Sequence, residues 1–389
     1  MSVSLYAELS WPQIAALPRE VALLVPLGLD DEESRRVARS FPQDTVLLPA
    51  VPYGFAAPDD EASGPLRLPR ALMRRVLGAI RRSLAAQGFT QVRFMDPCGV
   101  EAQVAPSSLV FSPVAARFPA RFEWPSDVAG RVVLVSTGHT EQHGVHLPSG
   151  VDTMIAEAIA AGVAAQAPQQ VVCLPTWPYG ASTHVREFPA TLNLGGRLLE
   201  DLFVEVVGSL VRQGARRILF SNAHGGNHSY LVNVVKAAGE RWPQAFSALE
   251  FLHTTGPALE RFRQSKRGGM GHGCELETSY MLHLRPDLVD MSRAMTETDF
   301  IATPNYYMDW IEGGRLIANP PWGDDTQTGI YGDATLATAE KGRLWLQAAI
   351  EEKLESIREV KEQQRRRVAR RELGHGAPGH LPPVDSAAR

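Results

Sequence analysis

The chain has 389 residues, of which 44% are hydrophobic and 21% are charged, proportions that are ordinary for a folded globular protein. Its formal net charge of −4 argues against a nucleic-acid-binding surface. No apolar run near the N-terminus is long enough to span a membrane, and three cysteines make no disulfide framework. We therefore predict a soluble cytoplasmic protein whose length favours two cores over one.

The first third of the chain predicts an α/β unit whose pattern returns later. Buried strands are expected at 21–25 and 92–95, and a helical stretch ends at Gln87 and Gly88. The sequence LPAVPYG at 48–54 matches LPTWPYG at 174–180, an offset of 126 residues. Such a match predicts an internal repeat.

The offset of 126 residues also aligns the strand at 92–95 with residues 218–221. The strand at 21–25 instead matches 131–135, an offset of 110. Because an ungapped register runs through a turn, a helix end and a strand, we infer a duplication rather than chance similarity of two strand–helix–strand units.

The first copy lacks the 16 residues by which the two offsets differ. This is about the length of the later segment that holds Glu141, His143 and Asp152, and Cys98 stands in the first copy at the place of His224. We therefore predict four parts, namely a degenerate domain without metal ligands at 1–112, a linker at 113–130, a catalytic domain at 131–372 and a disordered tail at 373–389.

The second copy alternates strands with helices. Strands are expected at 131–136 and 215–221. The predicted helices are 152–166, 196–214, 228–242, 275–284 and 338–371. This alternation predicts an α/β fold in which a mostly parallel sheet is sandwiched by helices, internally duplicated over the whole chain.

Three Gly-rich segments of the second copy carry histidines, and two of them also carry carboxylates. They read TEQHGVH at 140–146 with Asp152 shortly after, NAHGGN at 222–227 and GHGCELETS at 271–279. The first two follow predicted strands, and α/β sheets bind ligands beyond the carboxyl ends of their strands. Imidazole and carboxylate are the ligands of hydrolytic divalent-metal sites, and the metal-ligand candidates are Glu141, His143, Asp152 and His224.

The third segment offers two carboxylates as a further ligand. Glu275 and Glu277 are two residues apart, so in a helix they face different directions. His272 lies three residues before Glu275 and shares its side if the turn begins there. This spacing favours Glu275 as the ligand and gives Glu277 the role of anchoring the helix or supporting a ligand, although the opposite assignment stays open.

These motifs resemble the creatininase (creatinine amidohydrolase) family. The family is identified by TEQHGxHLPxxxD, PYGxS followed by FPxT, NxHGGN and HxGxxETS, which correspond to 140–152, 178–182, 188–191, 222–227 and, in part, 272–279. The resemblance covers about 130–350. The first copy is weakly similar to the same family.

The resemblance implies an α/β sandwich with two divalent metal ions, Zn, Mn or Fe. Glu141 and His224 would hold one ion, His143 would hold the second, and Asp152 would bridge them. Creatininase itself carries its remaining carboxylate ligand where this chain has Gly226, so Glu275 would be the substitute.

The resemblance also implies a metal-dependent amidohydrolase, in which a metal-activated hydroxide cleaves an amide, lactam or formamide bond of a small molecule. His272 matches the proton-transferring histidine of the family, and Glu275 is the other candidate for that role. Departures such as Ala190 in place of glycine make creatinine a doubtful substrate. Candidate substrate-binding residues are Trp177, Tyr179, Ser182, His184, Gly225, Trp310 and Trp322.

Two alternative functions stay open. The family includes a peptidase that trims a ribosomally made peptide in mycofactocin assembly, and a short peptide would need an open groove. A non-catalytic metal-binding scaffold is the other alternative.

Family members commonly form hexamers built from dimers, and a degenerate copy that replaced one subunit of each dimer would give a trimer. We expect a homo-oligomer, trimer or hexamer, without nucleic-acid or membrane partners.

Overall fold

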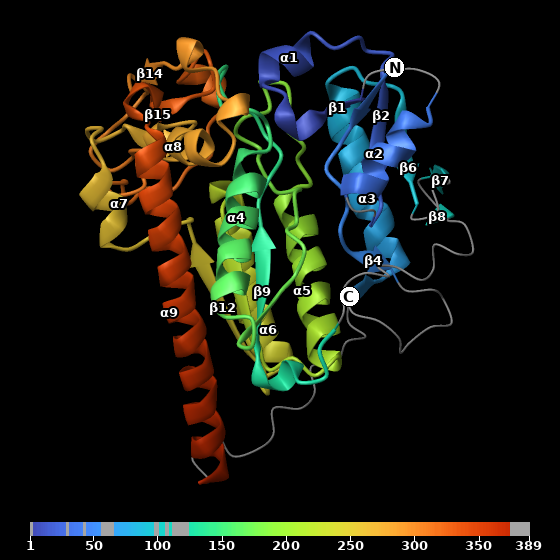
Figure 1. Cartoon of the computed structure of the whole chain (residues 1–389), viewed down its shortest axis with the longest axis vertical. Coiled ribbons are helices and arrows are strands. Elements are labelled where there is room, and N and C mark those ends of the chain that lie inside the picture. Colours follow the sequence, from blue (N-terminus) through green and yellow to red (C-terminus); the bar gives the residue numbers. More distant parts are fainter. Residues whose placement is uncertain are drawn as a thin grey trace.

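The computed structural model describes residues 3–28, 31–41, 44–55, 66–96, 101–105, 109–110 and 124–373. Most of the predicted linker, Cys98 and the predicted tail beyond Leu373 lie outside the described residues. The described part consists of two α/β units side by side, followed by a long C-terminal helix (Figure 1). In that part, no helix combines the length and the apolar character that a membrane crossing needs.

The larger unit is built on a four-stranded parallel sheet. Its order is β10 (Val171–Cys173), β9 (Val132–Thr137), β11 (Arg217–Asn222) and β12 (Phe246–Phe251). Every residue of β9 is buried, as expected for a central strand covered on both faces. The mostly parallel α/β fold is thereby confirmed.

Helices cover both faces of this sheet. Val133 and Val135 point into the core shared with α5 (Gly196–Arg212) and α6 (His228–Arg241). The alternate residues of β9 point into the opposite core, which is shared with α4 (Val151–Gln166), α8 (Glu275–Leu284) and α9 (Ala339–Glu372). The helix predicted at 275–284 has the same bounds as α8. These helices were predictable because their apolar residues recur locally at helical spacing.

A small antiparallel sheet and a short helix lie above the carboxyl end of the large sheet (Figure 1). The sheet has the order β13 (Met270–His272), β15 (Tyr331–Asp333) and β14 (Thr296–Glu297), and the helix is α7 (Pro257–Phe262). This sheet carries His272 to the sheet edge where β9 and β11 end.

The N-terminal unit has its own sheet, of order β1-β3-β2-β6-β7-β8. Its strands are β1 (Val3–Leu5), β2 (Ala22–Pro26), β3 (Thr45–Leu47), β6 (Val92–Met95), β7 (Glu101–Val104) and β8 (Leu109–Val110), and a separate pair is formed by β4 (Gly54–Phe55) and β5 (Arg67–Leu68). Its helices are α1 (Trp11–Ala15), α2 (Asp31–Arg39) and α3 (Arg70–Ala86). The first four strands of the sheet are parallel, and α3 packs against α5 of the larger unit (Figure 1).

Candidate active site

Two neighbouring strands deliver the site loops. Thr137 at the end of β9 pairs with Asn222 at the end of β11, and the Thr137 hydroxyl donates to the Asn222 side-chain oxygen at 2.9 Å. The Asn222 amide donates to the carbonyl of His224 at 2.7 Å, which fixes the loop after β11. The segments carrying Glu141 and His224 therefore meet at the carboxyl edge of the parallel sheet, as the sequence predicts.

Asp152, the second residue of α4, lies at the centre of the cluster. Its Oδ1 is 3.1 Å from His143 Nε2, and its Oδ2 is 3.0 Å from His224 Nδ1. Glu141 Oε1 lies 3.1 Å from the same His224 nitrogen, and all four side chains are buried. Ligand atoms 2.0–2.2 Å from one tetrahedral ion are about 3.3–3.6 Å apart, so these separations are close to those of atoms that share an ion. One carboxylate facing two imidazoles has the arrangement of a bridging ligand.

Backbone carbonyls orient the ring nitrogens. His143 Nδ1 donates to the Glu141 carbonyl at 3.1 Å, and His224 Nε2 donates to the Ala181 carbonyl at 3.3 Å. The other nitrogen of each ring faces a carboxylate, which outweighs burial and raises the pKa of both histidines; a bound cation would take the place of the proton on that nitrogen and use its lone pair. His272 follows the same rule, because its Nε2 donates to the Gln142 carbonyl at 2.7 Å and its Nδ1 lies 3.7 Å from Glu141 Oε1.

The charges of the cluster fit a cation. Glu141 Oε1 and Asp152 Oδ2 are buried and both face His224 Nδ1, at 3.1 and 3.0 Å, and two buried carboxylates side by side are costly unless a positive charge compensates. Burial opposes protonation of His143, but the Asp152 charge outweighs it and raises the His143 pKa to about 9. Burial lowers the pKa of His272 to about 3, so this ring is neutral. The imidazole and carboxylate donors suit Zn, Mn or Fe ions.

The structure corrects the assignment of the last carboxylate. Glu277 Oε1 lies 4.0 Å from His143 Nε2, and Glu277 forms a potential metal-binding group with His143 and Asp152. Glu275 lies elsewhere: its Oε1 is 2.5 Å from Lys341 Nζ, and its Oε2 accepts the Ser265 N–H at 2.8 Å. The prediction that Glu275 faces the ligands is therefore wrong.

The physical reason is where the helix begins. His272 belongs to β13, Gly273 has a φ of +56°, and α8 begins only at Glu275, so the expected helical spacing between His272 and Glu275 does not exist. The backbone N–H of Gly273 donates to Glu277 Oε2 at 2.6 Å and helps to orient this carboxylate. Gly226 leaves no room for a ligand, because a Cβ there would lie 2.2 Å from the Ala181 carbonyl oxygen.

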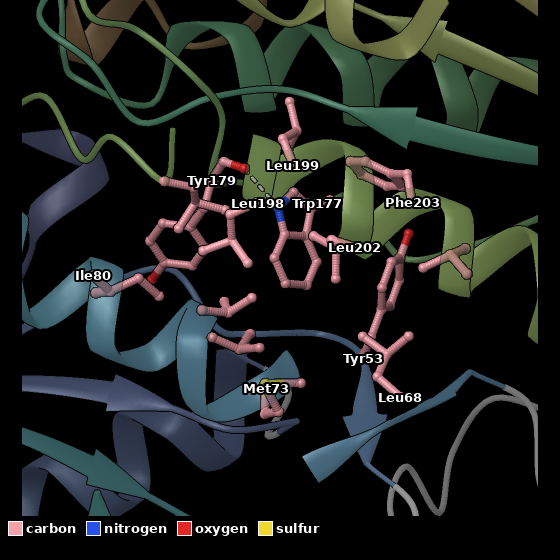
Figure 2. Close-up of a cluster of buried hydrophobic side chains, with 14 of the residues drawn as sticks. Tyr53, Leu68, Met73, Ile80, Trp177, Tyr179, Leu198, Leu199, Leu202 and Phe203 are labelled. Carbon is pink, nitrogen blue, oxygen red and sulfur yellow. Dashed lines mark hydrogen bonds between the residues drawn. The ribbon is translucent and has the colours of Figure 1, made fainter. Parts of the chain in front are cut away.

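Two predicted substrate-binding residues lie outside the site. Trp177 and Tyr179 are fully buried in the core between the two units, where Trp177 contacts Tyr53 and Phe203 (Figure 2). The Tyr179 hydroxyl donates to the Pro49 carbonyl of the N-terminal unit. Their prediction as substrate-binding residues is therefore wrong, because the N-terminal unit covers both side chains.

Three other predicted substrate residues, Ser182, His184 and Trp322, lie beside the cluster. The Ser182 hydroxyl donates to Glu141 Oε2 at 2.6 Å, and His184 Nε2 lies 3.4 Å from that hydroxyl. The Trp322 ring lies between His184 and His272, with centroid distances of 4.5 Å and 5.0 Å. These residues form an aromatic and polar wall beside His272.

The remaining two predicted substrate residues lie beside His224. A Cβ at Gly225 would come within 2.9 Å of the Trp310 ring. Both residues are half-buried, unlike the ligand cluster itself. Gly225 and Trp310 therefore lie on the more exposed side of the site.

His139 is a site residue that the sequence reasoning missed. It forms a potential metal-binding group with Glu141 and His224, and burial lowers its pKa to about 3. Its Nδ1 accepts the Gly180 N–H at 2.7 Å, so the neutral ring carries its proton on Nε2, 3.9 Å from Glu141 Oε2. At this distance the Nε2–H makes no hydrogen bond with Glu141, and it has no other hydrogen-bond partner among the described residues. Its position two residues before Glu141 in an extended loop was the available signal.

Buried imidazoles and carboxylates at the carboxyl edge of a parallel sheet define the chain as a candidate metal-dependent hydrolase. The family model described as creatinine amidohydrolase matches residues 120–357. The chain belongs to the creatininase family, and it is a hydrolase that acts on carbon–nitrogen bonds.

Two relatives illustrate this membership. The mycofactocin precursor peptide peptidase of Mycolicibacterium smegmatis (strain ATCC 700084 / mc(2)155) is 34% identical over 220 residues, which are 54% of this chain and 78% of the relative. The creatinine amidohydrolase of Pseudomonas putida is 27% identical over 243 residues, 59% of this chain and 89% of the relative. Among solved structures, one described as "Creatininase Mn" is 25% identical, has a TM-score of 0.51, and is matched over 59% of this chain and 91% of its own.

Proposed function

We propose that the chain cleaves an amide, lactam or formamide bond of a small molecule with two divalent ions, Zn, Mn or Fe. The observation that carries this proposal is the position of Asp152, whose two oxygens each face one imidazole at 3.0–3.1 Å. The proposed ligand set is Glu141, His143, Asp152, His224 and Glu277. When bound, such ions lower the pKa of a water molecule towards about 7 and polarise a carbonyl oxygen.

His272 is the proposed proton carrier. Its neutral ring offers the Nδ1 lone pair to the site, while the Gln142 carbonyl holds the opposite nitrogen. A base in this position takes a proton from the attacking water and returns it to the leaving nitrogen. Trp322 packs against the His272 ring and limits the access of bulk water. Ser182 keeps Glu141 in place through its 2.6 Å hydrogen bond.

A peptide is the second candidate substrate. Two relatives at 31% and 34% identity are mycofactocin precursor peptide peptidases, compared with 27% for the creatinine amidohydrolase. A peptide would have to approach from the side of Gly225 and Trp310, which are half-buried. The ligands themselves are buried, which favours a substrate whose scissile amide lies at or near the end of a chain.

The test is a hydrolysis assay with metal-free protein that has been reloaded with Zn, Mn or Fe. The panel contains lactams, formamides and short peptides, and the released amine is measured. We expect turnover of one class after reloading and none with Asp152→Asn. Bound metal without turnover of any class would favour a non-catalytic metal-binding role and would contradict the proposal.

The cytoplasmic location and the homo-oligomer, trimer or hexamer, stay predictions. A mass measured under native conditions tests the oligomeric state directly. A value equal to a single chain of 42.5 kDa would contradict a homo-oligomer.

A further inference from the structure

The two units share one strand register. In the N-terminal unit Leu23 pairs with Val92, and in the larger unit Val133 pairs with Ile218. These pairs are equivalent under the two sequence offsets of 110 and 126 residues. The strand order β3-β2-β6 likewise repeats as β10-β9-β11. Helices α3 and α5 both have 17 residues, and their bounds also differ by 126. Two unrelated units would not be expected to agree in order, register and helix length.

The units contact each other reciprocally. The Tyr53 hydroxyl donates to the Pro175 carbonyl at 3.2 Å, and the Tyr179 hydroxyl donates to the Pro49 carbonyl. Tyr53 and Tyr179 are equivalent at the 126-residue offset, as are Pro49 and Pro175. Each tyrosine therefore contacts the proline of the opposite unit. Identical subunits related by a two-fold axis contact each other in this reciprocal way.

This interface is apolar. Figure 2 shows side chains of α3 and α5 meeting around Trp177, with Met73 and Ile80 from α3 and Leu198 and Leu202 from α5. These side chains are all buried. Without the N-terminal unit, the larger unit would expose a contiguous apolar face of the kind that binds a partner.

One salt bridge favours pairing of the N-terminal unit with the larger unit over pairing of two larger units. Arg75 of α3 forms a salt bridge of 2.7 Å with Asp201 of α5, and these two positions are themselves equivalent at the 126-residue offset. If two larger units paired through this face, Asp201 would meet a second Asp201. Like charges at an interface disfavour that pairing. The arginine therefore favours the pairing within one chain over the pairing of two chains.

The N-terminal unit also supports the turn that leads to Asp152. The Ser149 hydroxyl donates to the Tyr6 carbonyl at 2.8 Å, and the Gly150 N–H donates to the Ala7 carbonyl at 2.9 Å. A Cβ at Gly150 would come within 2.8 Å of Ala7, so the two backbones approach closely. Residues 6–9 thus hold the start of α4, from which Asp152 points into the cluster.

We propose that the N-terminal unit is a built-in partner subunit. It covers, within one chain, the face through which two copies of the larger unit would otherwise pair, and it positions the turn before Asp152. Each chain then has one site and needs no second chain on this face. The proposal is independent of the substrate.

The first test cuts the connection between the units in the full-length protein. A recognition sequence for a site-specific protease is inserted between residues 115 and 116, and native mass and metal content are measured before and after cleavage. We expect the two halves to remain together as a one-to-one complex with the metal content of the uncut protein. Halves that separate at micromolar concentration, or larger halves that pair with each other, would overturn the proposal. Because mass carries the result, a failure of the proposed function does not affect it.

Exchanging the charges of Arg75 and Asp201 tests, in the cut protein, whether their salt bridge holds the two different units together. Arg75→Asp should weaken the association of the halves about two- to fivefold, which is the range for a half-exposed ion pair. The double variant Arg75→Asp with Asp201→Arg should restore it. Equal weakening in the single and double variants would contradict a direct pairing of these positions.

The support of the turn is tested by metal affinity. Ala7→Val adds bulk against Gly150, and we expect the dissociation constant for Mn²⁺ to rise about tenfold, as for other residues that orient metal ligands. Ala16→Val, at an exposed position of the same segment, is the control. Equal metal affinity in the two variants would show that residues 6–9 do not position the site.

Discussion

Glu275 and Glu277 provide a sharp test because they lie two residues apart on one helix and have different surroundings. Glu275 is fully buried against Lys341, whose side chain is 10% exposed. Replacing it by glutamine leaves the lysine charge buried without its partner, which costs about 3–5 kcal/mol. We therefore expect Glu275→Gln to lower the free energy of unfolding by about 3 kcal/mol while the metal content at saturation stays unchanged.

Glu277→Gln should have the opposite effects, namely little change in the free energy of unfolding and a large loss of metal affinity. Burial raises the Glu277 pKa to about 7, so a neutral amide is tolerated in the metal-free protein and its unfolding free energy changes little. As a direct ligand, however, Glu277 should contribute more than the 10- to 100-fold in metal affinity that supporting residues contribute. We therefore expect metal affinity and activity to fall by at least about 100-fold.

The assay combines urea unfolding of chelator-treated protein with metal analysis of reloaded protein. Glu275→Gln with Lys341→Met is the matched control, because removing both charges should recover part of the lost stability. A Glu275→Gln protein that loses its metal but keeps its stability, together with a Glu277→Gln protein that keeps its metal, would contradict the roles assigned to both residues.

Three further predictions concern the site and its surroundings. Chelation should abolish activity, and Mn²⁺, Zn²⁺ or Fe²⁺ should restore it; activity that survives in metal-free protein would contradict the metal centre. His272→Gln should lower kcat about 10²- to 10⁴-fold while metal content stays unchanged, as measured by steady-state kinetics and metal analysis, and an unchanged kcat would exclude His272 as the proton carrier. Burial lowers the pKa of His253 to about 4, below the unfolded value of about 6.5. The unfolded chain then binds more protons, so the stability due to this group is complete above pH 6.5 and is lost by up to about 3 kcal/mol as pH falls towards 4. His253→Asn should flatten this dependence in urea unfolding, and an unchanged slope would contradict the assignment.

The elements were predictable because their signals are local. The apolar run of β9 and the helical spacing in α5 and α8 lie within a few residues of each other along the chain. That Glu141 and Asp152 lie in one cluster was predictable for the same reason, since one short Gly-rich segment carries both.

The errors came from contacts between distant parts of the chain. Glu275 forms an ion pair with Lys341, which lies 66 residues away on α9. The spacing of residues along the sequence does not predict a pair so far apart. Trp177 and Tyr179 lie beside the site motif in sequence, but the N-terminal unit buries them. The available signal was the predicted repeat, because Tyr179 is the equivalent of Tyr53, and the hydroxyls of both tyrosines donate to equivalent prolines of the opposite unit.

The proposed site has Asp152 between two metal ions. Anomalous diffraction from crystals of the manganese-loaded protein tests it most directly. We expect two peaks about 3.5–4 Å apart, one beside His143 and Glu277 and the other beside His224 and Glu141, with the Asp152 carboxylate between them. A single peak, or peaks that do not contact Asp152, would contradict it.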